Sequence, residues 1–181
     1  KIGRITFVKY SPKEALQALI EGRVDLVTSL LPKDTFKVEK GGHSKVTKGR
    51  QDVTWTGGFL NLMSTHTLPL RDMRVRKALN YAIDRDAIRG SILSKDVMPA
   101  TQLVVPSING YNPNLKVWPY DPDKAKQLLD EARKDGVPVD KEITLYGRTG
   151  IYPNATEFME AALAMYQAVG LNVKLQMLEV G

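Results

Sequence analysis

The 181-residue chain contains no cysteine and only two histidines. The absence of cysteine excludes disulfides, a thiol nucleophile and cysteine-ligated metal sites. His43 and His66 do not have the HExxH spacing of a zinc-binding helix, so we interpret both as loop residues. We therefore predict no metal and no cofactor. A chain without thiols also fits an oxidising compartment.

Long apolar runs and catalytic motifs are missing as well. No apolar run approaches the roughly 20 residues that span a bilayer. The sequence has neither a GxSxG nucleophile elbow nor a GxxxxGK[ST] phosphate loop. Its acidic pairs, Asp84 with Asp86 and Asp121 with Asp123, stand at predicted helix starts, where the helix dipole stabilises them. These absences favour a binding module, and we predict that the chain is not an enzyme.

The net charge of +6 does not indicate a nucleic-acid partner. The one basic cluster, residues 37–50, is interrupted by Glu39 and three glycines, as in a solvated loop. Nucleic-acid binding would need clustered charge and a recognition motif. Hydrophobic residues make up 43% of the chain and charged residues 25%, which is typical of a folded globular protein.

The first third of the chain predicts alternating strands and helices. Residues 5–8 and 24–27 are apolar, β-prone runs typical of buried strands. Between them, Ser11 and Glu14 match a capping box, and Gly22 ends the helix that they start. A strand, a helix and a strand in this order indicate a βαβ unit. The elements predicted next are a weak helix at 32–40 and a strand at 53–63.

The remaining two thirds predict amphipathic helices packed on further strands. Asp72, Asp84 and Asp121 each precede an amphipathic pattern and are interpreted as N-caps. Asn154 with Glu157 resembles another capping box, which opens a helix through Ala168. The inward-facing positions of the first three helices are Val75, Ala78, Leu79 and Ala82; Ala87, Ile88 and Ile92; and Ala125, Leu128, Leu129 and Ala132. Strands are predicted at 143–146 and 171–178, an irregular stretch at 98–119 and a turn at 147–153. The order of elements predicts an α/β fold, with a mixed β-sheet flanked by helices.

Four segments resemble one protein family in order and spacing. They are ALIEGRVDLV (18–27), NLMSTHTLPLRDMRVRKALNYAIDRDAI (61–88), YDPDKAKQLLDEA (120–132) and AVGLNVKL (168–175). All four are similar to motifs of the family 5 extracellular solute-binding proteins, the oligopeptide-, dipeptide- and nickel-binding receptors of ABC importers. Most of the matching residues are caps or core positions, so we expect packing roles for Asp84 and Arg85.

The resemblance implies one lobe of a two-lobe, periplasmic-binding-protein-like (type II) fold. Residues 1–181 would form a single unit, the larger part of the C-terminal lobe, and both ends of the chain look cut. The whole protein would be periplasmic or extracellular, with or without a lipid anchor. It would capture a peptide or a similar small polar solute and deliver it to a membrane permease. The expected partners are therefore the ligand, the permease and the first lobe of the same protein.

Candidate ligand-binding residues lie at strand ends, because ligands of α/β sheets bind outside the carboxyl ends of strands. Arg148, Thr149, Tyr152 and Asn154 lie between a predicted strand and a helix N-terminus, which favours polar or anionic groups. The other candidates are Tyr10 and Ser11, which match a cleft-lining stretch of the family, Trp55 and Asn61 on the strand predicted before the Asp72 helix, and Glu179 after the last strand. A cap is the alternative role for Ser11 and Asn154, and a core position is the alternative for Trp55.

Two other functions stay open at this point. One is the ligand-sensing domain of a transcription regulator with the same fold, which an attached helix-turn-helix domain would reveal. The other is an enzyme whose catalytic half lies elsewhere in a longer chain. A signal peptide encoded upstream in the full-length gene would favour the importer receptor.

Overall fold

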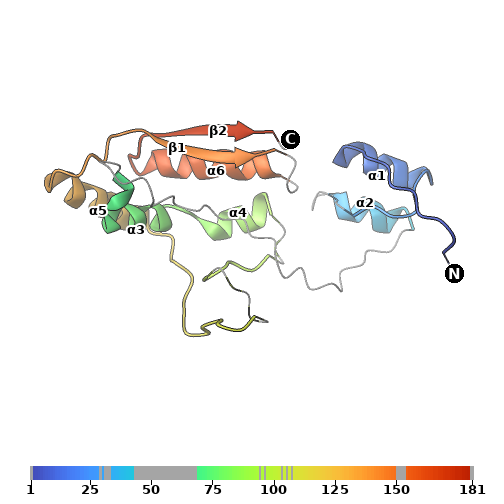
Figure 1. Ribbon diagram of the computed structural model, residues 1–181, viewed down its shortest axis with the longest axis horizontal. Coiled ribbons are helices and arrows are strands. Elements are labelled where there is room, and N and C mark those ends of the chain that lie inside the picture. The colour runs from blue at the N-terminus through green and yellow to red at the C-terminus, as the bar shows by residue number, and fades with distance from the viewer. Residues whose placement is uncertain are drawn as a thin grey trace.

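The computed structural model describes residues 2–28, 30, 34–42, 69–93, 95, 97–102, 104, 106, 108–149 and 154–179. The helices are α1 (Pro12–Ile20), α2 (Thr35–Lys40), the 3-10 helix η2 (Pro69–Arg71), α3 (Met73–Tyr81), α4 (Arg85–Ser91), α5 (Pro122–Lys134) and α6 (Ala155–Ala168). The strands are β1 (Ile143–Arg148) and β2 (Val173–Leu178). Helices α1 and α2 lie at one end of the molecule, and α3, α5, α6 and both strands lie at the other (Figure 1). Among the described helices, none has both the length and the apolar composition that crossing a bilayer requires.

Helices α3 and α5 form the centre of the main core. Their buried residues are those predicted from the sequence, namely Val75, Ala78, Leu79 and Ala82 beside α3 and Ala125, Leu128, Leu129 and Ala132 on α5. The Asp72 carboxylate accepts a hydrogen bond from the Arg74 N–H at 2.7 Å, and that of Asp121 accepts one from the Lys124 N–H at 2.8 Å. The predicted caps and inner faces of both helices are therefore confirmed.

Strands β1 and β2 are parallel neighbours, and α6 connects them and covers one face of the pair (Figure 1). The register pairs Ile143 with Val173 and Arg148 with Leu178. On β2, the predicted inner face is confirmed, because Val173 is buried and Leu175 and Met177 are half-buried. The α/β class is thus confirmed, and the sheet is purely parallel within the described residues.

The βαβ unit predicted at the start of the chain is only partly formed. Helix α1 has the predicted capping box, in which the Ser11 hydroxyl accepts from the Glu14 N–H and the Glu14 carboxylate accepts from the Ser11 N–H. Residues 5–8 and 24–27, however, form no strand within the described part of the chain. An extended segment becomes a strand only where a neighbour pairs with its N–H and C=O groups, which the local sequence does not supply.

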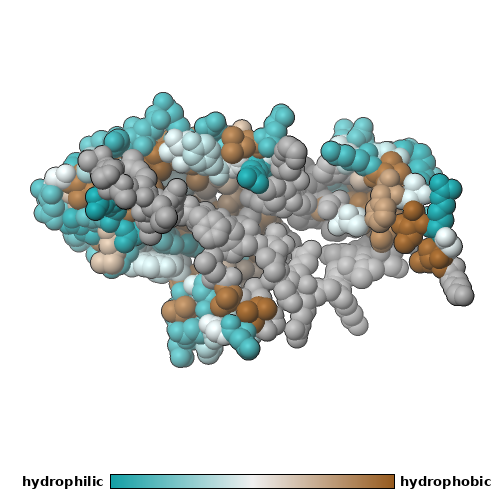
Figure 2. All heavy atoms as spheres, viewed as in Figure 1, coloured by the Kyte–Doolittle hydropathy of each residue, from teal (hydrophilic) through white to brown (hydrophobic). Residues whose placement is uncertain are grey.

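The unpaired segment leaves apolar surface exposed at this end of the molecule. Ile2, Ile5, Phe7 and Val8 are 82%, 66%, 92% and 55% exposed. Figure 2 shows hydrophobic residues gathered over the same N-terminal end. A smaller core of Leu16, Leu19 and Val38 joins α1 to α2 and has no buried residue in common with the main core.

Three smaller differences separate prediction from structure. Ala87 is exposed, although Ile88 is buried and Ile92 is half-buried, because the short helix α4 offers only a narrow inner face. Strand β1 continues to Arg148, two residues beyond the predicted end, since Thr149 still pairs with Leu178 of β2. Helix α2 lies inside the predicted 32–40 helix, while the predicted strand at 53–63 lies outside the described residues.

An ion-pair network at the start of α3 predicts a pH-dependent stability. The Arg74 guanidinium donates to both Asp72 oxygens, at 3.1 and 2.8 Å, and also to Asp135 at the end of α5. These hydrogen bonds hold the pKa of Asp72 below its ordinary value. The stabilisation is therefore complete above about pH 4, where aspartate in the unfolded chain is ionised, and is lost as the pH falls through the folded pKa.

Substituting Asp72→Asn tests this network, because asparagine still caps the helix but carries no charge. We expect a loss of about 1 kcal/mol in the free energy of unfolding at pH 7. The difference from the unmodified chain should shrink as the pH falls below about 4, in urea titrations at several pH values. Asp25→Asn, at an exposed position outside the network, is the control. A difference for Asp72→Asn that does not change with pH would contradict this account.

Candidate functional site

The carboxyl ends of β1 and β2 and the start of α6 meet at one edge of the sheet (Figure 1). The Thr149 N–H donates to the Leu178 carbonyl at 2.9 Å, which extends the strand pairing by one residue. The Thr149 hydroxyl lies 3.4 Å from the same carbonyl. Arg148 is paired with Leu178 in the register, and Glu179 follows directly. Three predicted site residues, Arg148, Thr149 and Glu179, therefore share this edge.

Arg148 and Glu179 give the edge two opposite charges. Both residues are exposed, and within the described part of the chain no hydrogen bond or ion pair engages either side chain. The N-terminus of α6 opens close by, and the Asn154 side chain does not cap its first N–H groups. A helix N-terminus and an arginine favour a carboxylate, whereas a glutamate favours an ammonium group. The edge can therefore hold a ligand that carries both charges.

Asn154 precedes α6 but does not cap it, so the capping box predicted for Asn154 and Glu157 is wrong. Its backbone is left-handed, with φ 63°, where an N-cap is usually extended. Asparagine tolerates this conformation better than most residues. The side-chain amide instead donates to the Ile92 carbonyl at the end of α4, at 2.7 Å. Through this hydrogen bond, Asn154 connects the start of α6 to the end of α4.

The candidates at the start of the chain are engaged in local interactions. The Ser11 hydroxyl donates to the Glu14 carboxylate at 2.6 Å, which lowers the pKa of Glu14 and fits the alternative role of Ser11 as a cap. The Tyr10 hydroxyl accepts from the Arg23 guanidinium at 3.4 Å, and that guanidinium lies 5.7 Å from the Tyr10 ring centroid. Among the described residues, no hydrogen bond or ion pair joins Tyr10 or Ser11 to the sheet edge. Trp55, Asn61 and Tyr152 lie outside the described residues.

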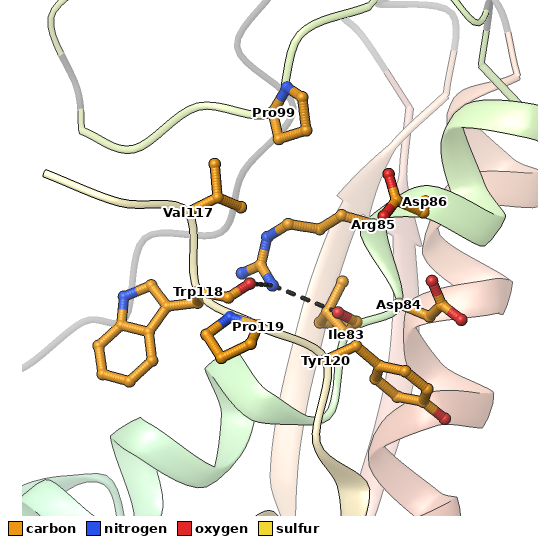
Figure 3. Close-up of a pocket in the computed structure, with 9 residues that line it drawn as sticks. All are labelled: Ile83, Asp84, Arg85, Asp86, Pro99, Val117, Trp118, Pro119 and Tyr120. Atoms are coloured by element: carbon orange, nitrogen blue, oxygen red, sulfur yellow. Dashed lines mark hydrogen bonds between the residues drawn. The ribbon is translucent and has the colours of Figure 1, made fainter.

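A shallow pocket of about 250 Å³ at the start of α4 was not predicted (Figure 3). It is lined by Ile83, Asp84, Arg85, Asp86, Pro99, Val117, Trp118, Pro119 and Tyr120. The Asp84 carboxylate caps α4 by accepting from the Ala87 N–H at 2.9 Å. The Arg85 guanidinium donates to the carbonyls of Asn80 and Ile83 at the end of α3, at 3.1 and 3.2 Å.

Arg85 has the environment of a structural arginine. Burial lowers the pKa of its guanidinium, and its hydrogen-bond acceptors within the described residues are neutral. The carbonyl end of α3 is the negative end of the helix dipole, which favours a cation there. These contacts fit the packing roles predicted for Asp84 and Arg85. The described residues also contain no group of His, Asp and Glu side chains that could hold a metal ion.

Comparison with known sequences identifies one family. Residues 1–180 match the family described as bacterial extracellular solute-binding proteins, family 5 Middle. The dipeptide-binding protein of Escherichia coli (strain K12) is 35% identical over 116 residues, which cover 62% of this chain and 21% of that protein. The nickel-binding periplasmic protein of the same organism is 30% identical over 189 residues, which cover 96% of this chain and 35% of that protein.

Comparison with solved structures shows the same fold. The periplasmic binding protein DppA of Helicobacter pylori, in complex with the peptide STSA, matches 93% of this chain and 31% of its own, with 21% identity and a TM-score of 0.61. The substrate-binding protein CtaP of Listeria monocytogenes matches 95% of this chain and 34% of its own, with 19% identity and a TM-score of 0.66. The chain thus spans about a fifth to a third of the length of these relatives. Because the family match covers nearly every residue, the chain belongs to the family 5 bacterial extracellular solute-binding proteins.

Proposed function

We propose that this chain is part of the substrate-binding component of an ABC importer, which captures a peptide or a similar small polar solute and delivers it to the membrane permease. The observation that carries the proposal is the family match over residues 1–180. The whole protein works outside the cytoplasm, in the periplasm or at the cell surface, with or without a lipid anchor. It binds its ligand without changing it chemically.

Residues 1–181 contribute part of the second of two lobes. The chain covers only 21% and 35% of two curated relatives, which leaves room in the whole protein for another lobe. Ligand lies between the lobes and stabilises the closed form to the extent that it binds that form more tightly than the open one. One lobe supplies half of the contacts, so this chain alone binds ligand weakly.

A peptide-like ligand fits the two charges at the sheet edge. Relatives include proteins named for binding dipeptides, di- and tripeptides, and glutathione, all of which carry amino and carboxylate groups. Arg148 and the α6 N-terminus face the carboxylate in this proposal, and Glu179 faces the amino group. Thr149, Tyr152, Asn154, Tyr10, Ser11, Trp55 and Asn61 complete the proposed set.

Mass spectrometry of the small molecules that co-purify with the full-length protein tests the ligand class. The expected result is a peptide or a similar small molecule with both charges. Relatives named for nickel and heme make a metal complex the competing result, so the same sample is assayed for metals. Recovery of nickel, heme or nucleic acid in place of such a molecule would contradict the proposal.

Substituting Arg148→Met in the full-length protein tests the proposed carboxylate contact. We expect about a tenfold loss of affinity for a co-purified peptide, which corresponds to one charge-assisted hydrogen bond. The same peptide with an amidated C-terminus should bind both proteins equally, as measured by calorimetry. Lys126→Met, on the exposed face of α5, is the control and should leave both affinities unchanged. Equal losses for the acid and the amide would place the carboxylate elsewhere.

A further inference from the structure

Residues 112–121, which we call the strap, are held at their C-terminal end by the end of α3. The Asp121 N–H donates to the Tyr81 carbonyl at 2.9 Å. The Trp118 and Tyr81 rings pack edge to face, with centroids 5.1 Å apart and an interplanar angle of 88°. A hydrogen bond and an aromatic contact thus join residues that are 40 and 37 positions apart in the chain.

Arg85 adds a third contact at this end of the strap. The Nη1 atom that donates to the Asn80 and Ile83 carbonyls also lies 3.4 Å from the Trp118 carbonyl. Figure 3 shows the guanidinium reaching from α4 toward the backbone of the strap, where it forms one side of the shallow pocket. The guanidinium therefore connects the strap to the carbonyl end of α3.

Within the described residues, the N-terminal end of the strap is held by the side chain of Gln102. Its Nε2 donates to the Asn112 carbonyl at 2.9 Å, and its Oε1 accepts from the Asn112 N–H at 3.1 Å. Gln102 thereby pairs with both backbone groups of Asn112, as a neighbouring strand would. This pair is exposed, and water competes for the same donors and acceptors.

We propose that the two ends of the strap are held independently and that the Gln102 end opens first. Arg85 and Tyr81 are the positioning residues at one end, and Gln102 is the positioning residue at the other. An exposed pair of hydrogen bonds on one side chain opens at a lower free energy than an end held by two hydrogen bonds from different residues and an aromatic contact. Opening at Gln102 frees Asn112 while Trp118 stays on Tyr81. The pocket at the start of α4 consequently keeps the wall that Trp118 and Pro119 provide.

Amide hydrogen exchange of the 181-residue chain, followed by NMR, tests the contacts at the two ends of the strap separately. Gln102→Glu keeps an acceptor for the Asn112 N–H but places an oxygen against the Asn112 carbonyl. We expect exchange at Asn112 to accelerate about tenfold and exchange at Asp121 to stay unchanged. Arg85→Met should give the opposite pattern, with about tenfold faster exchange at Asp121 and an unchanged exchange rate at Asn112.

Matched variants separate the proposal from a general loss of stability. Arg89→Met, on the same helix as Arg85 but paired with Asp86 at 3.2 Å, should leave Asp121 unchanged. If Arg85→Met destabilises the whole chain, Trp118→Leu tests the same end of the strap by removing only the ring contact. If Gln102→Glu accelerates exchange at Asp121 as much as at Asn112, the strap opens as one unit, and the proposal is overturned. Unchanged exchange at Asp121 in both Arg85→Met and Trp118→Leu would also overturn it.

Discussion

Replacing Leu129 by alanine lowers the free energy of unfolding by about 2–5 kcal/mol, the usual range for a leucine removed from a packed core. Leu129 on α5 is only 1% exposed and belongs to the same core cluster as Val75 of α3 and Val139. Both of these valines are themselves fully buried. The substitution removes apolar contacts and leaves a cavity that close-packed neighbours fill only in part.

Urea unfolding followed by circular dichroism measures this loss. Leu26→Ala is the matched control, because it deletes the same atoms at a position that is 73% exposed. The control should change the free energy of unfolding by less than about 0.5 kcal/mol. Similar losses in the two variants would mean that α5 does not pack in the centre of the core.

Replacing Gly147 by valine destabilises the chain by about 1–3 kcal/mol, the typical cost of overpacking. Gly147 lies on β1 beneath α6 and is buried. A Cβ atom there would lie 2.5 Å from the Met177 Sδ and 2.9 Å from the Met159 Cγ, distances that require both side chains to move. Valine adds two further methyl groups to that Cβ, so it takes more of the space that the two methionine side chains occupy.

A substitution at the next residue separates overpacking from strand propensity. Tyr146→Val places valine on the open face of the same strand, where Tyr146 is 60% exposed. We expect this variant to lose less than about 0.5 kcal/mol and Gly147→Ala to fall between the two. Thermal unfolding of all three variants gives the order, and a Gly147→Val variant as stable as the unmodified chain would show that α6 does not approach β1 so closely.

The parts of the fold that the sequence predicts well are those that depend on local interactions. The caps Asp72 and Asp121 accept hydrogen bonds from N–H groups two and three residues away, and the apolar spacing of α3 and α5 directly marks their buried faces. Residues 5–8 show the limit of this reasoning. Their composition favours a strand, but a strand also requires a paired neighbour, which no local pattern specifies.

The candidate site shows the same division. The meeting of Arg148, Thr149 and Glu179 at one edge follows from a parallel strand pair whose carboxyl ends coincide. The role of Asn154 depends on Ile92, 62 positions earlier in the chain, and the contact of Arg85 with Trp118 spans 33 positions. Neither partner is marked by spacing or by a motif, so the sequence offered only a ligand contact or a cap for Asn154 and did not predict the pocket beside Arg85.

The packing of Met159 and Met177 over Gly147 makes the junction of α6 and the sheet sensitive to peroxide. In a chain without cysteine, thioethers are the only sulfur groups that an oxidant can attack. Met177 is half-buried, whereas Met159 is only 9% exposed. A sulfoxide oxygen on Met177 would insert a polar atom into the narrow space above Gly147, so oxidation of this methionine would weaken the packing of α6 against both strands.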